Sequence, residues 1–387
     1  MLKFLCRVCA SDELKYVEDF RSLSRVTSDC KPFPAGGELA VCLACGAVQK
    51  PSHKKWLEEI DEIYRNYEIY FQSEGAEQAV FDPNEGVARP RSAVMLANLE
   101  QASKVAAQGR VIDIGCGRGA FLSAFSKFRP CWELYGYELE RRDAAYLQQI
   151  PGFRDLYYGD VDKMPGGYDI ISLVHSLEHF TEPVADLEKL GRKLAPDGVL
   201  LIEVPNGAVS PFDLLVADHA THFSKKHLAA VLDRAGFSSA LVADDWIVKE
   251  LSAVASKQGR KAEPVRLGRG EDDYSRVRNF VQWLVKTVEM AGTLSKKNPA
   301  KFGIFGTSIA SMWLFGQIGD DVAFFVDEDP NRSRTLHGRP VFKPDDAPDG
   351  GVVFCALLPH VAQAVSARLA RPGIEYVSTG PLPPQTA

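Results

Sequence analysis

The chain has 387 residues, of which 45% are apolar and 25% are charged, and its net charge is −6. At roughly 100–200 residues per domain, this length predicts two or three domains with sizeable cores. An acidic chain without a long run of lysine or arginine argues against a protein that grips a nucleic-acid backbone. No apolar stretch approaches the roughly 18 residues of a membrane span, and the first residues lack the apolar core of a secretory signal. We therefore expect a cytoplasmic protein that acts on a small molecule.

Four of the eight cysteines form two pairs with two-residue spacers, Cys6–Cys9 and Cys42–Cys45. Each spacer lets both sulfurs approach one ion, and four thiolates complete a tetrahedral zinc site without an open position. Two disulfides are the alternative, which a reducing compartment disfavours. The sequence therefore predicts a structural zinc-binding module over residues 1–56.

A helical lead-in is predicted for residues 57–108, with amphipathic stretches at 56–64 and 90–106. A cluster of tyrosines that includes Tyr70 lies between these two stretches. Such a cluster fits core packing and a lid over an active site about equally well. Tyr70 is therefore a candidate site residue with a structural alternative.

A strand, a glycine loop and a helix follow one another over residues 109–122. A β-branched run ends at Asp113, and Gly115, Gly117 and Gly119 precede the predicted helix. This order begins a βαβ unit, and the glycines let a cofactor lie against bare backbone. An acid two residues before the first glycine suits a ligand with an ammonium group, whereas it would repel a pyrophosphate. The loop therefore favours S-adenosylmethionine over a dinucleotide.

A second strand ends at Glu138, 19 residues after Gly119, where a carboxylate can accept both hydroxyls of a ribose. A helix is predicted at 183–194. Further strands are predicted at 168–174, 198–203 and 246–254, the last of which would close the sheet.

The motifs DIGCGRG, YGYELE, GDVDKMP and HSLEHF, within residues 109–206, resemble those of class I S-adenosylmethionine-dependent methyltransferases. The resemblance implies a methionine site at Asp113, Gly115 and Gly117, a ribose site at Glu138, an adenine site at Asp160 and Val161, and His175 near the sulfonium. With its cysteine module and C-terminal α/β region, the chain resembles the zinc-containing sugar C-methyltransferases. Those enzymes act on keto intermediates of nucleotide-linked deoxysugars.

Candidates for the acceptor side lie in the segment 213–224. Asp218–His219 matches the family's acid–histidine pair, whereas Val216 stands where the family has a tyrosine. A carbon acceptor needs a base beside a carbonyl and an oxygen acceptor needs a base near a hydroxyl, so His219 is the candidate base for either. Histidines before a helix also cap or pack, which leaves a structural role open.

The pair Glu178–His179 follows the fourth predicted strand. It is either an active-site pair or the start of the next helix, and His179 is kept as a catalytic candidate. Tyr70 resembles the family's other active-site tyrosine.

Residues 256–387 predict a second, smaller Rossmann-like α/β domain. Asp327 follows Gly306 by 21 residues, a spacing that fits a dinucleotide site, but the glycine pattern between them is degraded. A scaffold and a binding domain both fit these features. The resemblance implies that this domain helps to cover a nucleotide-sugar substrate.

The sequence thus predicts an α/β chain with a zinc module at 1–56, a methyltransferase domain at 57–255 and a C-terminal domain at 256–387. The predicted function is methyl transfer from S-adenosylmethionine to a sugar, by C-methylation of a keto-sugar or by O-methylation. An RNA methyltransferase with a zinc module and a non-catalytic scaffold remain as alternatives. The oligomeric state is left open.

Overall fold

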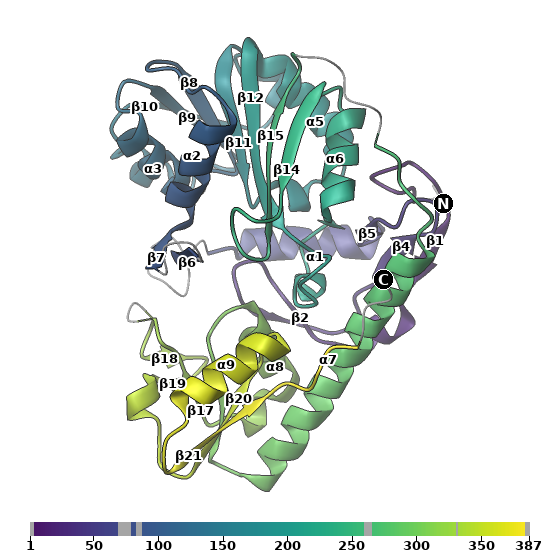
Figure 1. Ribbon diagram of the computed structural model, residues 1–387, viewed down its shortest axis with the longest axis vertical. Helices are drawn as coiled ribbons and strands as arrows, with labels where there is room; N and C mark the ends of the chain where they lie inside the picture. The colour runs from purple at the N-terminus through teal and green to yellow at the C-terminus, as the bar shows by residue number, and fades with distance from the viewer. Residues whose placement is uncertain (1–3, 69–78, 83–86, 259–264, 330–331, 384–387) are drawn as a thin grey trace.

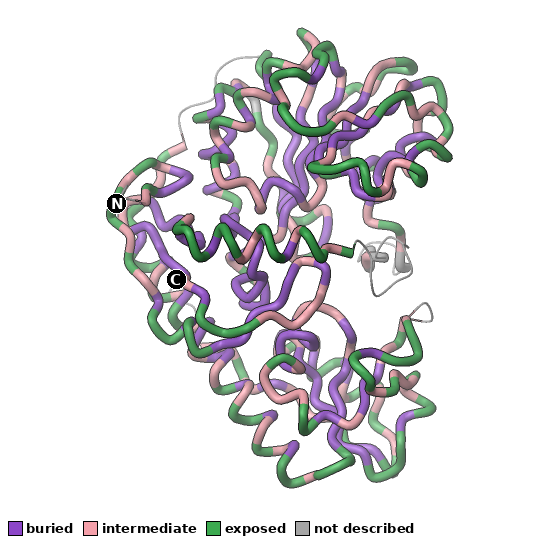
Figure 2. The backbone as a smooth tube through the Cα atoms, turned by 180° about the vertical axis from the view of Figure 1, so that it is seen from behind, coloured by how far each residue is buried: buried purple, intermediate pink, exposed green. Residues whose placement is uncertain are grey.

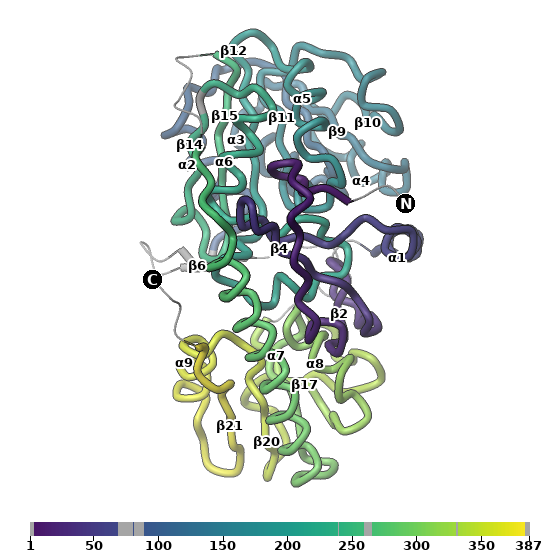
Figure 3. Tube along the Cα trace, turned by 90° about the vertical axis from the view of Figure 1, so that its right-hand side faces the viewer, coloured from purple at the N-terminus to yellow at the C-terminus, as the bar shows by residue number. Residues whose placement is uncertain are grey.

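The structure, a computed structural model, describes residues 4–68, 79–82, 87–258, 265–329 and 332–383. Two large sheets lie at opposite ends of the molecule, and the N-terminal strands with helix α1 (Lys54–Arg65) lie at the junction between them (Figure 1). In the side view, helix α7 (Glu271–Lys297) runs from this junction along the smaller sheet (Figure 3). Within the described residues, no helix combines the length and the apolarity that a membrane crossing needs.

The larger sheet has seven strands in the order β10-β9-β8-β11-β12-β15-β14. Their bounds are β8 Arg110–Ile114, β9 Glu133–Glu138, β10 Phe153–Tyr158, β11 Tyr168–Val174, β12 Leu194–Pro205, β14 Ser239–Ala243 and β15 Glu250–Ser256. The first five strands in this order are parallel, whereas β15 runs antiparallel to both of its neighbours. The strand predicted at 246–254 therefore lies inside the sheet, and β14, which was not predicted, forms the edge.

Helices cover both faces of this sheet because alternate strand residues are apolar on each side. Val111, Ile170 and Leu201 pack with helices α2 (Arg91–Ala102) and α3 (Ala120–Phe128). Their sequence neighbours Ile112, Ile171 and Leu200 pack on the other face with α5 (Pro183–Lys193) and α6 (Lys225–Arg234). Figure 2 shows this buried central layer in purple. The short elements around the sheet are α4 (Ala144–Leu147), β6 (Ala79–Asp82), β7 (Val87–Pro90), η2 (Val161–Lys163) and η3 (Leu177–His179).

The N-terminal module has a four-stranded sheet in the order β1-β4-β5-β13. Its bounds are β1 Leu14–Tyr16, β4 Ala40–Cys42, β5 Val48–Gln49 and β13 Thr221–His222, with η1 (Glu18–Ser22), β2 (Arg25–Val26) and β3 (Pro32–Phe33) beside it. Strand β13 comes from the segment between β12 and α6 and pairs antiparallel with β5. A strand from the acceptor-side segment therefore completes the sheet of the cysteine module.

The smaller sheet has the order β18-β19-β17-β16-β20-β21, and all its neighbouring strands are parallel except β18 and β19. Its elements are β16 Phe302–Phe305, α8 Ile309–Ile318, η5 Gly319–Asp321, β17 Phe324–Val326, β18 Thr335–Leu336, β19 Arg339–Phe342, η6 Pro344–Asp346, β20 Gly351–Cys355, α9 Pro359–Leu369 and β21 Ile374–Ser378. Two mostly parallel α/β sheets confirm the predicted fold class. The domain boundaries after residues 56 and 255 stay a prediction.

Candidate functional site

The four cysteines of the two pairs lie together, with their sulfurs within 4.8 Å of one another. The Sγ atoms of Cys6 and Cys45 are 3.6 Å apart, and so are those of Cys9 and Cys42. A zinc–sulfur bond of about 2.3 Å gives a tetrahedron whose sulfurs are separated by about 3.8 Å. All four are free cysteines, so the arrangement fits one tetrahedral ion and not two disulfides.

Gly46 directly follows the second cysteine pair and adopts φ +84°. A Cβ atom there would also collide with the carboxylate of Asp273, so the turn requires glycine on two grounds.

The glycine loop lies at the carboxyl end of β8, as the sequence predicts for a cofactor site. Gly115 and Gly117 adopt φ +75° and +52°, and a Cβ on Gly115 would lie 2.9 Å from Cβ of Ser176. Asp113 is buried, and its Oδ1 accepts a hydrogen bond from Ser172 Oγ at 2.7 Å. This bond ties the end of β8 to β11.

Glu138 ends β9 beside the loop. Its Oε1 accepts a hydrogen bond from the Gly117 backbone N–H at 2.6 Å, and burial raises the pKa of its carboxyl. Asp160 is exposed and accepts a bond from the Asp162 N–H at 3.0 Å, directly before Val161 begins η2. The predicted ribose and adenine residues therefore lie at or just after the carboxyl ends of β9 and β10, the two strands on one side of β8.

His175, at the end of β11, adopts φ +52° and lies in a buried cluster of charged groups. Its Nδ1 is 3.3 Å from Glu178, and its Nε2 is 3.7 Å from Glu203 and 3.8 Å from Glu250. Burial and the charge of Arg91 favour the neutral ring, but these carboxylates outweigh them and raise the pKa of His175 to about 10. The motif alone does not reveal these three acids around the ring, and the place of His175 near the sulfonium stays a prediction.

His179 and His219 face each other, with ring centroids 4.8 Å apart and ring planes at 90°. His179 Nδ1 lies 3.0 Å from the Asp218 carbonyl oxygen. The Asp218 carboxylate accepts hydrogen bonds from the backbone N–H and the hydroxyl of Ser28, and one of its oxygens lies 3.4 Å from His179 Nδ1. The predicted acid–histidine pair is therefore adjacent in sequence, but Asp218 is not the acid that holds His219.

Asp213 is the acid that holds His219. Its two carboxylate oxygens lie 2.8 Å from Nδ1 of His219 and 2.7 Å from Nδ1 of His222. Since a carboxylate only accepts, each imidazole presents an Nδ1–H to it, which leaves the lone pair of each neutral ring on Nε2. Burial alone would raise the pKa of Asp213, but the two imidazoles outweigh it and hold that pKa well below its usual range.

Lys50 is fully buried and is the second unexpected member of this cluster. Its Nζ lies 2.9 Å from Nε2 of His222 and 2.5, 3.2 and 3.3 Å from the carbonyl oxygens of Val216, Leu214 and His219. Burial lowers its pKa to about 7. Burial and the Lys50 charge lower the pKa of His222 to about 4, so that this ring is neutral.

Two further groups place three possible metal-binding atoms within 4.8 Å: Asp213 with His219 and His222, and Glu178 with His179 and His219. Hydrogen bonds to Nδ1 already account for the position of each imidazole in these groups. We therefore describe Asp213, His219 and His222 as a hydrogen-bonded cluster, beside which His179 bonds to the backbone of Asp218.

Other predicted residues have different places. Tyr70 lies outside the described residues. Val216 is buried, and its carbonyl oxygen accepts from Lys50. Ser224 is at the N-cap of α6, but its hydroxyl bonds to the His227 side chain of that helix and not to a backbone N–H. His219 and His222 do not cap that helix through their side chains; both bond to Asp213.

Sequence reasoning missed Asp213 and Lys50 as members of the site. Asp213 had a signal, because it lies six residues before His219 in a segment already singled out. Lys50 had none, because 172 residues separate it from His222.

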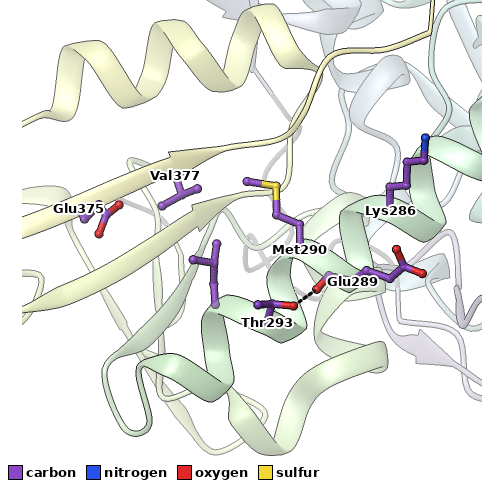
Figure 4. A pocket seen from close by; sticks show the side chains of 7 residues that line it. Lys286, Glu289, Met290, Thr293, Glu375 and Val377 are labelled. Atoms are coloured by element: carbon purple, nitrogen blue, oxygen red, sulfur yellow. Dashed lines mark hydrogen bonds between the residues drawn. The ribbon is translucent and has the colours of Figure 1, made fainter.

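A surface pocket of about 440 Å³ lies between α7 and β21 (Figure 4). Lys286, Glu289, Met290 and Thr293 reach it from α7, and Glu375 and Val377 from β21. None of its lining residues belongs to the glycine loop or to the histidine cluster.

A family model described as a methyltransferase domain matches residues 87–241. These residues include the glycine loop, Glu138, both facing histidines and Asp213. The chain therefore contains a methyltransferase domain.

Similar curated proteins align with less than half of the chain. Demethylspheroidene O-methyltransferase of Rhodobacter capsulatus is 30% identical over 148 residues, which are 33% of this chain and 36% of that protein. Ubiquinone biosynthesis O-methyltransferase of Xanthomonas campestris pv. campestris is 26% identical over 140 residues, 34% of this chain and 59% of that protein. An uncharacterized Synechococcus protein is 33% identical over 104 residues, 24% of this chain and 25% of that protein. The chain thus spans about a quarter to three fifths of the length of these relatives.

Among solved structures, a putative O-methyltransferase from Nostoc punctiforme has a TM-score of 0.35 at 19% identity, over 42% of this chain and 55% of that chain. Human N-acetylserotonin methyltransferase in complex with SAM has a TM-score of 0.36 at 17% identity, over 44% of this chain and 51% of that chain. At these TM-scores, neither structure bears on the substrate.

Proposed function

We propose that this chain transfers a methyl group from S-adenosylmethionine to a hydroxyl of a sugar, most simply a nucleotide-linked one, with His219 as the base. One observation carries the proposal: the cofactor loop and the facing histidines are neighbours. Gly115 lies against Ser176, and the three residues after Ser176 form η3, which ends at His179 opposite His219. A cofactor on the loop would therefore have its reactive end close to both imidazoles.

The residues at the loop fit S-adenosylmethionine. The positive φ angles leave bare backbone for its close approach, and Glu138 places a half-buried carboxylate where ribose hydroxyls can donate. When bound, this cofactor supplies an electrophilic methyl group on a sulfonium. The remaining chemistry belongs to the chain, which must align the acceptor and remove its proton.

Oxygen is the favoured acceptor atom. Two of the relatives are named O-methyltransferases, and O-methylation needs only a base beside a hydroxyl. Methylation at carbon also needs a donor that stabilises an enolate oxygen, and the apolar side chain of Val216 offers none. The proposal that the acceptor is a sugar rests on the resemblance of this sequence to sugar methyltransferases.

His219 must be neutral to accept the proton of the acceptor. Burial lowers its pKa, but the hydrogen bond and charge of Asp213, with the charges of Glu178 and Asp218, raise it above the usual 6.5. Methyl transfer is therefore lost as the pH falls through this raised pKa and is fully present above it. We expect the acidic limb of kcat/KM to have a midpoint above pH 6.5.

The test is to incubate the full chain with methyl-labelled S-adenosylmethionine and a panel of nucleotide sugars that includes keto forms. The methyl chemical shift of the product distinguishes an oxygen acceptor from a carbon acceptor. His219→Ala is expected to lower kcat by about 10²–10⁴-fold, the usual contribution of a general base, while the cofactor Kd stays within about twofold.

The matched control is His360→Ala, an exposed histidine on α9 outside this site, which should leave turnover unchanged. Full turnover by His219→Ala would remove the base assignment. If no sugar of the panel accepts the methyl group, the proposed sugar substrate is wrong. If the methyl group of the product is bound to carbon, the proposed hydroxyl acceptor is wrong.

A further inference from the structure

Lys50, a lysine of the cysteine module, contacts the backbone of the candidate base His219. Lys50 follows β5 directly, and its backbone N–H donates to the Ala220 carbonyl oxygen at 3.0 Å. Strand β5 pairs with β13, with Val48 opposite His222. Backbone pairing therefore carries Lys50 into the segment that holds Asp213, His219 and His222.

The side chain of Lys50 has only acceptors around it. Three backbone carbonyl oxygens, of Leu214, Val216 and His219, and one imidazole nitrogen, of His222, lie within 3.3 Å of Nζ. An ammonium has three protons to donate and no lone pair, so this cage fits the charged form, which predominates below the Lys50 pKa of about 7. An ammonium there can donate only to the lone pair on Nε2 of His222, which directs the remaining proton of that ring to Nδ1.

A chain of hydrogen bonds runs from Lys50 to His219. Lys50 donates to His222, the Nδ1–H of His222 donates to Asp213, and the Nδ1–H of His219 donates to the other Asp213 oxygen. With Asp213 held between two donors, His219 keeps one tautomer, and its ring packs edge-to-face with that of His179 at a centroid distance of 4.8 Å. We propose that Lys50 is a positioning residue of this methyltransferase site: by holding His222 and the backbone of 214–219, it fixes the orientation and tautomer of His219.

The proposal deepens the proposed function, since it concerns the candidate base of that same site. It also gives the cysteine module a role beyond folding. Arg7, which lies between the first two cysteines, donates from Nη1 to the carbonyl oxygens of Lys50 and Ala220, both at 2.7 Å. The module therefore fixes the backbone of Lys50, whereas residues of the acceptor-side segment hold its side chain.

Several charged and titratable groups face His219. The carboxylates are Asp213, Glu178 from η3 and Asp218, and the other imidazoles are His179 and His222. Tyr64 of α1 packs on His179 and has a pKa raised by burial, so it is neutral. The positive charge of Lys50 attracts the Asp213 carboxylate and lowers the pKa of His222. Removing it favours protonation of the imidazoles, whereas removing the Asp213 charge opposes it.

The experiment is an NMR titration of the full chain labelled with ¹³C- and ¹⁵N-histidine, with S-adenosylhomocysteine as the probe in the cofactor site. His219→Gln and His222→Gln assign the two signals. In the wild type, both rings should be Nδ1–H tautomers. Lys50→Met should raise the pKa of His219 by about 0.5–1 pH unit and mix the tautomers of His222, while Asp213→Asn should lower the pKa of His219. Opposite shifts are an electrostatic signature that a loss of packing does not produce.

Lys15→Met is the matched control, because it makes the same change on β1 of the same sheet, where the side chain is exposed. It should leave both histidines unchanged. If Lys50→Met does not fold, Lys50→Gln serves in its place, since its amide still donates to a carbonyl but carries no charge.

With the acceptor identified by the panel, Lys50→Met should lower kcat by about 10–100-fold at unchanged cofactor Kd. Wild-type pKa values and tautomers of His219 and His222 in a folded Lys50 variant would overturn the proposal. The titration reads ring protons directly, so this outcome is distinct from a failure of methyl transfer.

Discussion

At the scale of single residues, Glu138 offers the sharpest test of the cofactor site. Its carboxylate lies half-buried at the end of β9, where it accepts a hydrogen bond from the Gly117 N–H. Hydrogen bonds to a charged group contribute about 1.5–3 kcal/mol, so Glu138→Ala should weaken S-adenosylmethionine binding by about 10–100-fold. Isothermal titration calorimetry measures this change directly.

The control for Glu138 lies two residues further along the chain. Glu140 is exposed and pairs with Arg142 at 3.3 Å, so Glu140→Ala should bind the cofactor as the wild type does. Unchanged binding by Glu138→Ala would show that the ribose lies elsewhere.

At the scale of elements, the sequence predicts those elements that are determined by a few adjacent residues. The glycine loop and the strand that ends at Glu138 could be predicted because each is set by a few adjacent residues. The Asp213–His219 bond could not, because Asp218 is adjacent to His219 in sequence while Asp213 is six residues away, and only the fold turns Asp218 toward Ser28. The place of β13 in the module's sheet depends on a pairing between segments that are far apart in sequence, which no periodicity encodes.

That pairing makes a prediction about the metal. Because β4, β5 and β13 form one sheet, and Cys42 ends β4 while Cys45 lies between β4 and β5, an ion on the four sulfurs would stabilise β13 as well. Removing zinc with a strong chelator should therefore speed amide hydrogen exchange by tenfold or more in peptides from 40–50 and from 213–224, about 1.4 kcal/mol of local stability. Strands β8 and β9 should be unaffected.

Metal analysis before and after chelation provides the control for this experiment. Close to one zinc ion per chain is expected before treatment. Faster exchange in 40–50 but not in 213–224 would mean that β13 is held by the larger sheet and not by the module.

At the scale of the whole molecule, one apolar core joins segments that the sequence assigns to three domains. Residues 17–48, 212–216 and 277–358 all contribute buried side chains to it. Phe212, which directly precedes Asp213, packs on Trp283 of α7 and Trp313 of α8 at centroid distances of 5.6 and 6.0 Å. The acceptor-side segment is thus supported from the C-terminal region as well as from the cysteine module.

Trp313 tests this long-range support, since it is fully buried in the shared core. Trp313→Ala should lower the free energy of unfolding by about 3–5 kcal/mol and should also speed hydrogen exchange in 210–216, about 100 residues away in sequence. Phe342→Ala is the matched control, because Phe342 packs on a separate core of the same C-terminal sheet. It should destabilise that sheet without changing exchange in 210–216. Equal exchange in 210–216 for Trp313→Ala and the wild type would mean that the C-terminal region and the acceptor-side segment are energetically independent, so that the candidate base depends on the cysteine module alone.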